Sequence, residues 1–296
     1  MMKNWDWFRK QNENRGILLV RCADRAGIVA AVSQFLFSYG ANIIESHQYS
    51  TNPKGGTFFI RIEFECPGLR EKEAGMKLGF QEVARVFLME WKLIAVREVK
   101  RMAIFVSKES HCLLELLWEW QSGDLITELV LVISNHEDTK DMVEALGVPF
   151  YYIPATKENR QEAERQHLTL LQEHQVDFIV LARYMQILTP SFVANYQNKI
   201  INIHHSFLPA FVGAKPYERA YERGVKLIGA TSHYVTNDLD EGPIIEQDIQ
   251  RVNHRDDAEA LKRIGRSVER SVLIRAVKWH LEDRIIVDGN KTIVFQ

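Results

Sequence analysis

The feature that most constrains the fold of this chain is a change in its apolar rhythm near residue 100. After that point, short and nearly continuous apolar segments alternate with helical patterns: RMAIFVS, LVLVISN, FYYIP, VDFIVLA and KIINIH. Apolar strands separated by helices are typical of a parallel sheet with both faces covered. We therefore expect an α/β domain with a mostly parallel sheet, whose ligand site lies at the carboxyl ends of the strands.

Residues 15–98 follow a different order. ILLVRC reads as a strand, and IVAAVSQFLFSYG repeats apolar residues at helical spacing until Gly40 ends the helix. ANIIESHQYS and TFFIRIEFEC alternate as strands around the turn TNPKGG, and a second helix is followed by the strand WKLIAVREV. This βαββαβ order predicts a small ferredoxin-like sheet. We therefore expect two domains, residues 15–98 and residues 101–296.

Charge and cysteine content narrow the class of protein. Lys and Arg number 37 against 39 Asp and Glu, which leaves a formal charge of -2, and no basic run with interleaved aromatics is present. The three cysteines form no CxxC pair, so a reducing compartment is expected rather than a disulfide framework. No segment is a charge-free apolar run of about 18 residues. We expect a cytoplasmic protein that binds neither nucleic acid nor a membrane.

The loop after the first strand of the second domain lacks a phosphate-binding pattern. Its sequence, SKESHC over residues 107–112, contains no glycine, so neither a dinucleotide fingerprint nor a P-loop is present. Glu109 would repel a phosphate there. NAD, ATP and a phosphorylated substrate are therefore disfavoured at this loop.

The stretch INIHHSFLP places polar side chains at the end of an apolar strand. Residues two apart share a face of a strand, so Asn202 and His204 point the same way and His205 points the other way. An amide and an imidazole side by side could act on a carbonyl group. Taken alone, however, such a pair is more often structural than catalytic.

A second polar segment follows the strand GATSHYVT. In the loop NDLDEG, Asp240 could fold back toward the carboxyl edge of the sheet. Asn, His and Asp together can polarise a carbonyl, donate a proton and orient a water molecule. The alternative for Asp238 and Asp240 is turn chemistry, because Asp side chains cap their own backbone well.

The segments NIH-S-LP and HYVTNDLDEGPII resemble the folate-dependent formyltransferases, the family of glycinamide ribonucleotide transformylase, over residues 101–284. The resemblance implies a Rossmann-like formyltransferase domain in which Asn202, His204 and Asp240 are catalytic. LARYMQILTP is similar to the folate-binding stretch of the family, and residues 236–240 would form the other wall. The implied substrate-binding residues are Arg183, Tyr184, Met185, Ile187, Leu188, His205, Thr236, Asn237 and Asp238.

Within that superfamily the chain looks most like the formyltetrahydrofolate deformylases, the hydrolytic members. Transferases carry a Gly-rich loop where this chain has SKESHC, and they usually place a proline where it has His205; the end GNKTIVF also matches the deformylases. The resemblance implies hydrolysis of 10-formyltetrahydrofolate to formate and tetrahydrofolate, which supplies formate to one-carbon and purine metabolism. Neither a cofactor nor a metal is implied. Lys215, Pro216 and Tyr217 are expected to close the space that an amine substrate would occupy.

The segment DRAGIVAAVSQFLFSYGANI resembles an ACT domain, a module that commonly binds amino acids and pairs edge to edge. The resemblance implies a homo-oligomer and a small amino-acid effector near Asp24, Arg25, Gly27 and Asn42, where helix N-terminal amides attract a carboxylate. The alternative is an Asp that caps the helix beside a turn glycine, with no ligand.

Three rival interpretations remain at the level of sequence. The same trio could transfer the formyl group to an amine acceptor. The chain could also be an amino-acid sensor that binds folate without turnover, although a pure binder has no need of Asn202, His204 and Asp240. Zinc held by His204, His205 and His233 is disfavoured because adjacent strand residues face opposite sides.

Overall fold

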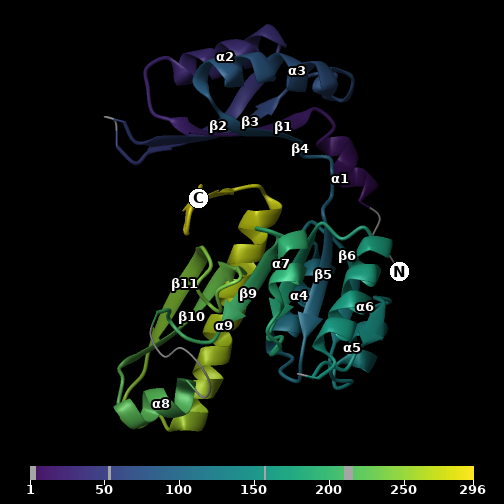
Figure 1. Cartoon of the computed structure of the whole chain (residues 1–296), viewed down its shortest axis with the longest axis vertical. Helices are drawn as coiled ribbons and strands as arrows, with labels where there is room; N and C mark the ends of the chain where they lie inside the picture. Colours follow the sequence, from purple (N-terminus) through teal and green to yellow (C-terminus); the bar gives the residue numbers. More distant parts are fainter. Residues whose placement is uncertain (1–4, 53–54, 157, 210–215) are drawn as a thin grey trace. The chain divides into compact units, whose positions relative to one another are not determined.

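The chain forms two compact units. The computed structural model describes residues 5–52, 55–156, 158–209 and 216–296. Backbone contacts define a small unit, which holds residues 5–99 with Asp283–Ile286 and Ile293–Gln296, and a large unit, which holds Lys100–Glu282 with Val287–Thr292 (Figure 1).

The small unit contains the elements that the βαββαβ pattern predicts. Its sheet is antiparallel and has the strand order β2-β3-β1-β4, which confirms the ferredoxin-like expectation. A short helix precedes the sheet. The elements are α1 (Asp6–Gln11), β1 (Arg15–Ala23), α2 (Ile28–Ser38), β2 (Asn42–Ser50), β3 (Thr57–Glu65), α3 (Leu69–Phe87) and β4 (Glu90–Ala95).

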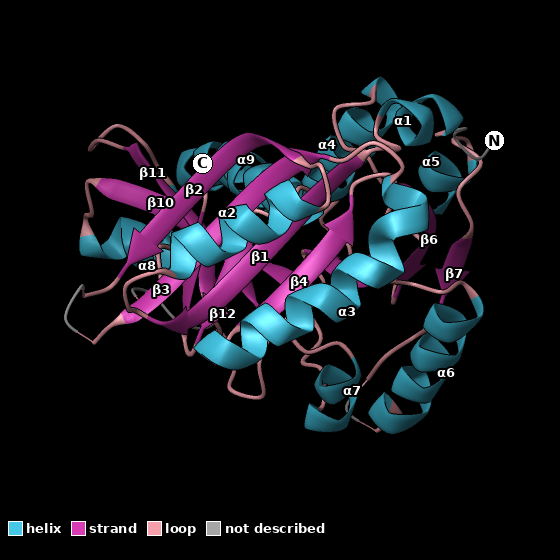
Figure 2. Cartoon of the chain, turned by 90° about the horizontal axis from the view of Figure 1, so that it is seen from above, coloured by secondary structure: helices cyan, strands magenta, loops and turns pink. Residues whose placement is uncertain are grey.

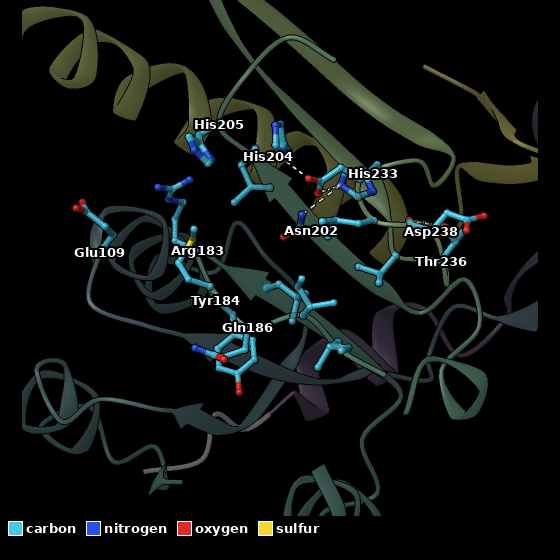
Figure 3. A pocket seen from close by; sticks show the side chains of 18 of the residues that line it. Glu109, Arg183, Tyr184, Gln186, Asn202, His204, His205, His233, Thr236 and Asp238 are labelled. Carbon is cyan, nitrogen blue, oxygen red and sulfur yellow. Dashed lines mark hydrogen bonds and ion pairs between the residues drawn. The ribbon is translucent and has the colours of Figure 1, made fainter. Parts of the chain in front are cut away.

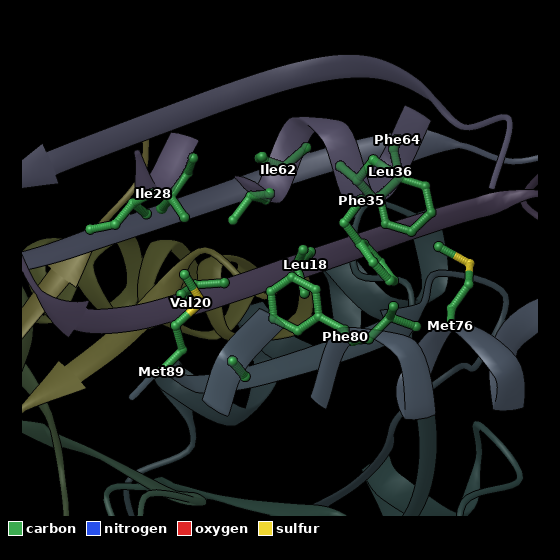
Figure 4. Packing of buried hydrophobic residues seen from close by; sticks show 14 of the residues in the cluster. Leu18, Val20, Ile28, Phe35, Leu36, Ile62, Phe64, Met76, Phe80 and Met89 are labelled. Carbon is green, nitrogen blue, oxygen red and sulfur yellow. The ribbon is translucent and has the colours of Figure 1, made fainter. Parts of the chain in front are cut away.

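The core of the small unit lies between the sheet and helices α2 and α3, which cover one face (Figure 2). Alternation along β1 sends Leu18 and Val20 into this core, because residues two apart share a face. The rings of Phe35 from α2 and Phe80 from α3 pack edge to face, with centroids 5.0 Å apart (Figure 4). Burial of apolar surface therefore holds the helices on the sheet.

The large unit is built on a seven-stranded sheet of order β11-β10-β9-β8-β5-β6-β7. Pairs from β9 to β7 are parallel, and β10 runs antiparallel to both of its neighbours. This confirms the mostly parallel α/β expectation. The elements are β5 (Arg101–Val106), α4 (His111–Ser122), β6 (Glu128–Ser134), α5 (Lys140–Glu144), β7 (Phe150–Tyr152), α6 (Arg160–Glu173), β8 (Phe178–Ala182), α7 (Pro190–Asn195), β9 (Ile200–His204), α8 (Pro216–Arg223), β10 (Leu227–Tyr234), β11 (Ile244–Arg251), α9 (Ala258–Leu281), β12 (Ile285–Asp288) and β13 (Lys291–Val294).

Helices cover both faces of this sheet. On β8, the ring of Phe178 lies 4.7 Å from that of His280 on α9. The next residue, Ile179, instead packs in a cluster with Leu171 of α6 and Phe192 of α7. Neighbouring strand residues face opposite sides, so each face has its own helical cover. This is why the strands read as continuous apolar runs.

Helices α8 and α9 and the hairpin β12–β13 are additional to the elements expected from the pattern. Helix α9 begins where the side chain of Asp257 accepts a hydrogen bond from the backbone N–H of Ala260 at 2.8 Å, a normal N-cap. It packs on β9, β10 and β11 and contacts α4 and α8. Among the described residues, no helix combines the length and the apolar character that a membrane span needs.

Candidate active site

A cavity of about 460 Å³ opens in the large unit beside the ends of β8 and β9 (Figure 3). Its volume is in the range of sites for small organic ligands. The three residues expected to be catalytic and the nine expected to bind substrate all line it. They come from β9 and the residue that follows it, from the segment after β8 and from the segment after β10. The structure therefore brings both predicted walls and the predicted trio into one pocket.

Strand β9 presents Asn202 and His204 on the pocket face. Asn202 lies beside Leu181 of β8 and opposite His233 of β10 in the sheet register, and His204 lies opposite Thr231. The buried His204 side chain is 5% exposed, whereas Asn202 is half-buried. As predicted, the two polar side chains share one face of the strand.

Asp240 reaches this face from the segment between β10 and β11. Its backbone adopts the left-handed conformation, with φ at 57°, which Asp tolerates better than most residues. Its Oδ2 lies 3.2 Å from Nδ1 of His204, and its Oδ1 lies 3.7 Å from Nε2 of His233. Burial alone would raise the pKa of Asp240, but the two imidazoles hold this pKa well below its usual range. The carboxylate is therefore ionised beside His204.

The contact with Asp240 sets the role of each nitrogen of His204. A carboxylate only accepts hydrogen bonds, so Nδ1 is the nitrogen that carries a proton toward it. The other nitrogen, Nε2, is buried and has no hydrogen-bond partner among the described residues. The imidazole thus has one free nitrogen available to a bound molecule.

His233 is a site residue whose position the sequence did not predict. Its Nδ1 lies 2.9 Å from the carbonyl oxygen of Tyr234, so Nδ1 donates to that oxygen. Its Nε2 lies 3.2 Å from Nδ2 of Asn202, which can donate to it when the ring is neutral. This contact fixes the amide of Asn202. The signal that could have found His233 is the antiparallel register that places it opposite Asn202, but register is a property of the folded sheet.

The wall after β8 combines a polar anchor with apolar side chains. Tyr184 is buried and packs against Phe105, while Met185 and Ile187 line the pocket although they are 58% and 50% exposed. The hydroxyl of Ser107 accepts a hydrogen bond from the backbone N–H of Met185 at 3.0 Å. Leu188 and Arg183 line the same wall, and Thr236, Asn237 and Asp238 line the facing segment. Exposed apolar side chains in a cavity suit a flat organic ring.

His205 does not point away from His204, and that expectation is wrong. The two rings lie 5.1 Å apart, and both residues line the pocket. The reason is that β9 ends at His204, so the alternation of a strand does not extend to His205. Burial, with Arg183 and His204 nearby, lowers the pKa of His205 to about 3, so this ring is neutral at pH 7.

The structure describes only part of the group of residues that we expect to close the space of an amine substrate. Lys215 and the side chain of Pro216 lie outside the described residues. Tyr217 lines the pocket and is 7% exposed. Its hydroxyl donates a hydrogen bond to Glu269 of α9.

The four residues expected to bind an effector lie in two places in the small unit. Asp24, Arg25 and Gly27 form the turn between β1 and α2, where Gly27 precedes the helix with φ at 94°. Asp24 does not cap the helix, because its carboxylate accepts a hydrogen bond from the hydroxyl of Ser50, at the end of β2. Asn42 begins β2 at the other end of the sheet, about 26 Å from Ser50 at the rise of a strand. Within one chain, Asn42 therefore lies away from the Asp24–Gly27 turn, because α2 carries the chain along the sheet before β2 begins.

One group of side chains among the described residues has the composition of a metal site. Donor atoms of His111, Cys112 and Glu269 lie within 4.8 Å of one another. The chemistry fits a metal poorly, however. Burial, and then the charge of Glu269, raise the pKa of the Cys112 thiol, so the thiolate that binds metal is disfavoured. Glu269 already binds His111 and Tyr217.

Two family profiles match the chain. The Formyl transferase profile matches residues 100–277, and the ACT domain profile matches residues 16–72. The chain is therefore a formyl transferase-type protein with an ACT domain in front, as the resemblance implied.

The relatives specify the branch of this class. A formyltetrahydrofolate deformylase from Bacillus subtilis (strain 168) is 65% identical over 295 residues, which is 100% of this chain and 98% of the relative. The chain belongs to the formyltetrahydrofolate deformylase family. The crystal structure of a formyltetrahydrofolate deformylase from Pseudomonas syringae pv. tomato str. DC3000 superposes with a TM-score of 0.92 at 46% identity, covering 98% of this chain and 100% of that one. A glycinamide ribonucleotide transformylase from Symbiobacterium toebii covers only 67% of this chain and 95% of its own, at 29% identity and a TM-score of 0.64.

Proposed function

We propose that this chain hydrolyses 10-formyltetrahydrofolate to formate and tetrahydrofolate at the pocket between β8, β9 and the segment after β10. The observation that carries the proposal is the approach of Asp240 to His204, with Nδ1 and Oδ2 3.2 Å apart, beside the amide of Asn202. The family to which the chain belongs supports the same reaction.

Asn202 and His204 would hold the formyl oxygen. The free Nε2 of His204 and the amide N–H of Asn202 are the two donors, and Asp240 favours the protonated imidazole by its negative charge. As water attacks the carbon, the carbonyl oxygen gains negative charge, and donors already in place stabilise it without reorganisation.

Proton transfer would complete the reaction. Asp240 orients the attacking water, and the proton that water loses passes to the Asp240–His204 pair. The C–N10 bond then breaks, and N10 accepts a proton relayed from His204. Protein groups alone polarise the carbonyl in this scheme, so we propose that neither a cofactor nor a metal takes part. Full activity in the presence of a chelator is the expected result, and loss that zinc restores would contradict it.

The test of the proposed function is formate release from 10-formyltetrahydrofolate with no amine added. We expect the wild-type chain to release formate and tetrahydrofolate in equal amounts. Replacement of Asn202 by Ala removes one oxyanion donor and is expected to lower kcat by about 100- to 1000-fold. A chain that releases formate only when an amine acceptor is supplied would be a transferase. A chain that binds the folate without any product would be a sensor.

The small unit supports a further part of the proposal, regulation by a small amino acid at the Asp24–Gly27 turn. The amides of the first turn of α2 have no side-chain cap, so a carboxylate could bind them. A panel of single amino acids, tested for a shift in rate or melting temperature, decides this point. No shift with any of them would remove the effector and leave the chemistry intact.

We also propose that the chain is a cytoplasmic homo-oligomer. Strand β2 lies at the edge of the sheet, so its edge could pair with a second copy of the chain. The exposed side chains of Ile43, Ile44 and Tyr49 could pack in such an interface. The three cysteines are free and buried, which suits a reducing compartment. Light scattering after gel filtration and cell fractionation test the two statements; a monomer or a membrane-bound fraction would contradict them.

A further inference from the structure

A buried carboxylate that the proposed mechanism does not use stands behind one wall of the pocket. Glu269 of α9 is 1% exposed. The hydroxyl of Tyr217 donates to its Oε1 at 2.5 Å, Nε2 of His111 lies 2.8 Å from its Oε2, and Nε of Arg183 lies 3.5 Å from the same oxygen. These four residues, from four separate segments, form the Glu269 cluster.

The Glu269 cluster is a network of compensated charge. Burial alone would raise the pKa of Glu269, but His111, Arg183 and Tyr217 beside it hold this pKa below its usual range. The carboxylate is thus ionised, and removal of its partners would leave an uncompensated buried charge. Such a network holds its members in fixed positions.

Two members of the cluster face the pocket on the side of His205. Arg183 and Tyr217 both line the cavity, and the ring of Tyr217 lies 6.2 Å from that of His205. In Figure 3, Arg183 and His205 lie together on one side of His204, and Asp238 lies on the other side. The Glu269 cluster therefore borders the pocket on the His205 side of the trio. The segment after β10 borders it on the opposite side.

Packing leaves the ring of Tyr217 little freedom. It belongs to an apolar cluster with Ile228 and Leu261. Gly265 of α9 lies directly beneath it, and a Cβ at that position would stand 2.1 Å from the hydroxyl oxygen. Arg183 is held as well, because its backbone is left-handed, with φ at 63°, and its guanidinium is paired with Glu269. This wall is filled and fixed rather than open.

A formyl carbon held by Asn202 and His204 can be attacked by water or by an amine, and the amine needs more room. We propose that the Glu269 cluster determines this choice: Tyr217 fills the space beside His205, and Glu269 positions Tyr217 and Arg183 so that water enters and amines do not. The inference rests on the proposed function and deepens it, because it assigns the preference for water to named side chains.

The experiment measures how the formyl group is divided between water and an added amine. O-Methylhydroxylamine is a suitable probe, since it is larger than water and neutral at pH 7. Its nitrogen would form a bond to the formyl carbon, the C–N10 bond would break, and N10 would receive the proton that the amine nitrogen loses. The products are tetrahydrofolate and the N-formyl derivative of the probe. With a 13C-labelled formyl group, NMR gives the ratio of formylated probe to formate.

The wild-type chain is expected to give mainly formate, with a small ratio of formylated probe to formate above the background without enzyme. Tyr217→Leu shortens the filling side chain while keeping it apolar, and the ratio should rise at least tenfold, about the lower limit of size discrimination in a packed pocket. Tyr217→Phe is the matched comparison, because it keeps the ring that fills the space and loses only the hydrogen bond to Glu269; its ratio should rise far less than that of Tyr217→Leu. Glu269→Gln keeps the size of the side chain and removes its charge, and it should give an intermediate ratio.

Each outcome bears on the inference. A folded, hydrolytic Tyr217→Leu variant with the wild-type ratio would overturn it and leave Tyr217 as an anchor of α8 on α9. If thermal melting shows that the Tyr217→Leu variant is not folded, the Glu269→Gln variant is compared with wild type instead. An unchanged ratio of formylated probe to formate in Glu269→Gln would also overturn the inference. Wild-type chain that formylates the probe as readily as the variants would do the same. Absence of formate from wild-type chain without amine is a different result, because it would remove the proposed function itself and the inference with it.

Discussion

The two units bury polar side chains in different ways. In the described part of the small unit, the buried polar side chains are those of Asn12 and Arg61, and the core under α2 and α3 is apolar. Arg61 binds Glu45 and Glu63 at 3.0 and 3.3 Å on the other face of the sheet. The large unit instead buries His167, His204, His233, Glu164 and Glu269 among others. A buried polar group costs free energy unless it is paired, so the large unit carries more of this cost than the small unit does.

The largest effect is expected in the apolar core of the small unit. Phe80 is fully buried, and its ring lies 5.0 Å from that of Phe35 and 4.9 Å from that of Trp91. Phe80→Ala should lower the free energy of unfolding of this unit by about 3–5 kcal/mol, because it leaves a cavity. Urea unfolding measures the loss. Leu78→Ala, on the same helix but at a residue that is 71% exposed, is the control and should change stability by less than about 0.5 kcal/mol. Similar losses for the two variants would contradict the comparison.

In the large unit, a polar substitution should affect rate more than stability. Asp240→Asn keeps the size of the side chain but removes the charge that favours protonated His204, so kcat for formate release should fall by about 100- to 10,000-fold. The exposed Asp238, in the same segment, gives the control Asp238→Asn, for which a far smaller loss is expected. Near wild-type kcat for Asp240→Asn would show that the carboxylate is not part of the chemistry.

Acid should destabilise the large unit through its buried imidazoles. Burial lowers the pKa of His167 from 6.5 to about 4, so below pH 6.5 the unfolded chain binds a proton that the folded chain does not. Stability therefore falls as the pH drops, by about 2 kcal/mol between pH 7 and pH 5 for this residue. His167→Phe should reduce the slope of unfolding free energy against pH over that interval. An unchanged slope in urea unfolding would mean that His167 is protonated in the folded chain.

The smallest effect concerns how helices begin. In the small unit, α2 and α3 follow the left-handed glycines Gly27 and Gly68 without a side-chain cap, whereas α9 has the Asp257 cap. Asp257→Ala should lower the free energy of unfolding by about 1 kcal/mol, and Asp257→Asn, which keeps an acceptor oxygen, should lower it less. Equal losses for Ala and Asn would show that the hydrogen bond to Ala260 contributes nothing.

Much of the fold was predictable because its signals are local. Apolar runs and period-two alternation predict β1, β5 and β9 close to their observed bounds, and the βαββαβ order predicts the sheet of the small unit. The shared face of Asn202 and His204 follows from the same periodicity. Their grouping with Asp240 came from the resemblance to a family, since turn chemistry was the better explanation of Asp240 from the residues alone.

The remaining features depend on long-range contacts. The direction of the His205 side chain depends on the end of β9 at His204. The pairing of His233 with Asn202 depends on the register of β10 against β9. Glu269 lies in α9, a helix that the sequence pattern did not single out, and the partners of its carboxylate, Tyr217 and His111, come from other segments. The separation of Asn42 from the Asp24–Gly27 turn has the same kind of cause, because it depends on the path of α2 along the sheet.

Because β10 runs antiparallel to β9, the length of the segment after β10 determines whether Asp240 can reach His204. Tyr234 ends β10 beside Ile201, so the chain must return about 10 Å, three residues of strand, before Asp240 reaches the imidazole at the end of β9. Gly242 lies so close to Tyr234 that a Cβ there would stand 1.8 Å from its carbonyl oxygen, which leaves no slack at the end of the return. Insertion or deletion of a single residue between 235 and 241 would thus move the carboxylate of Asp240 away from His204, although surface connections elsewhere usually tolerate changes in length.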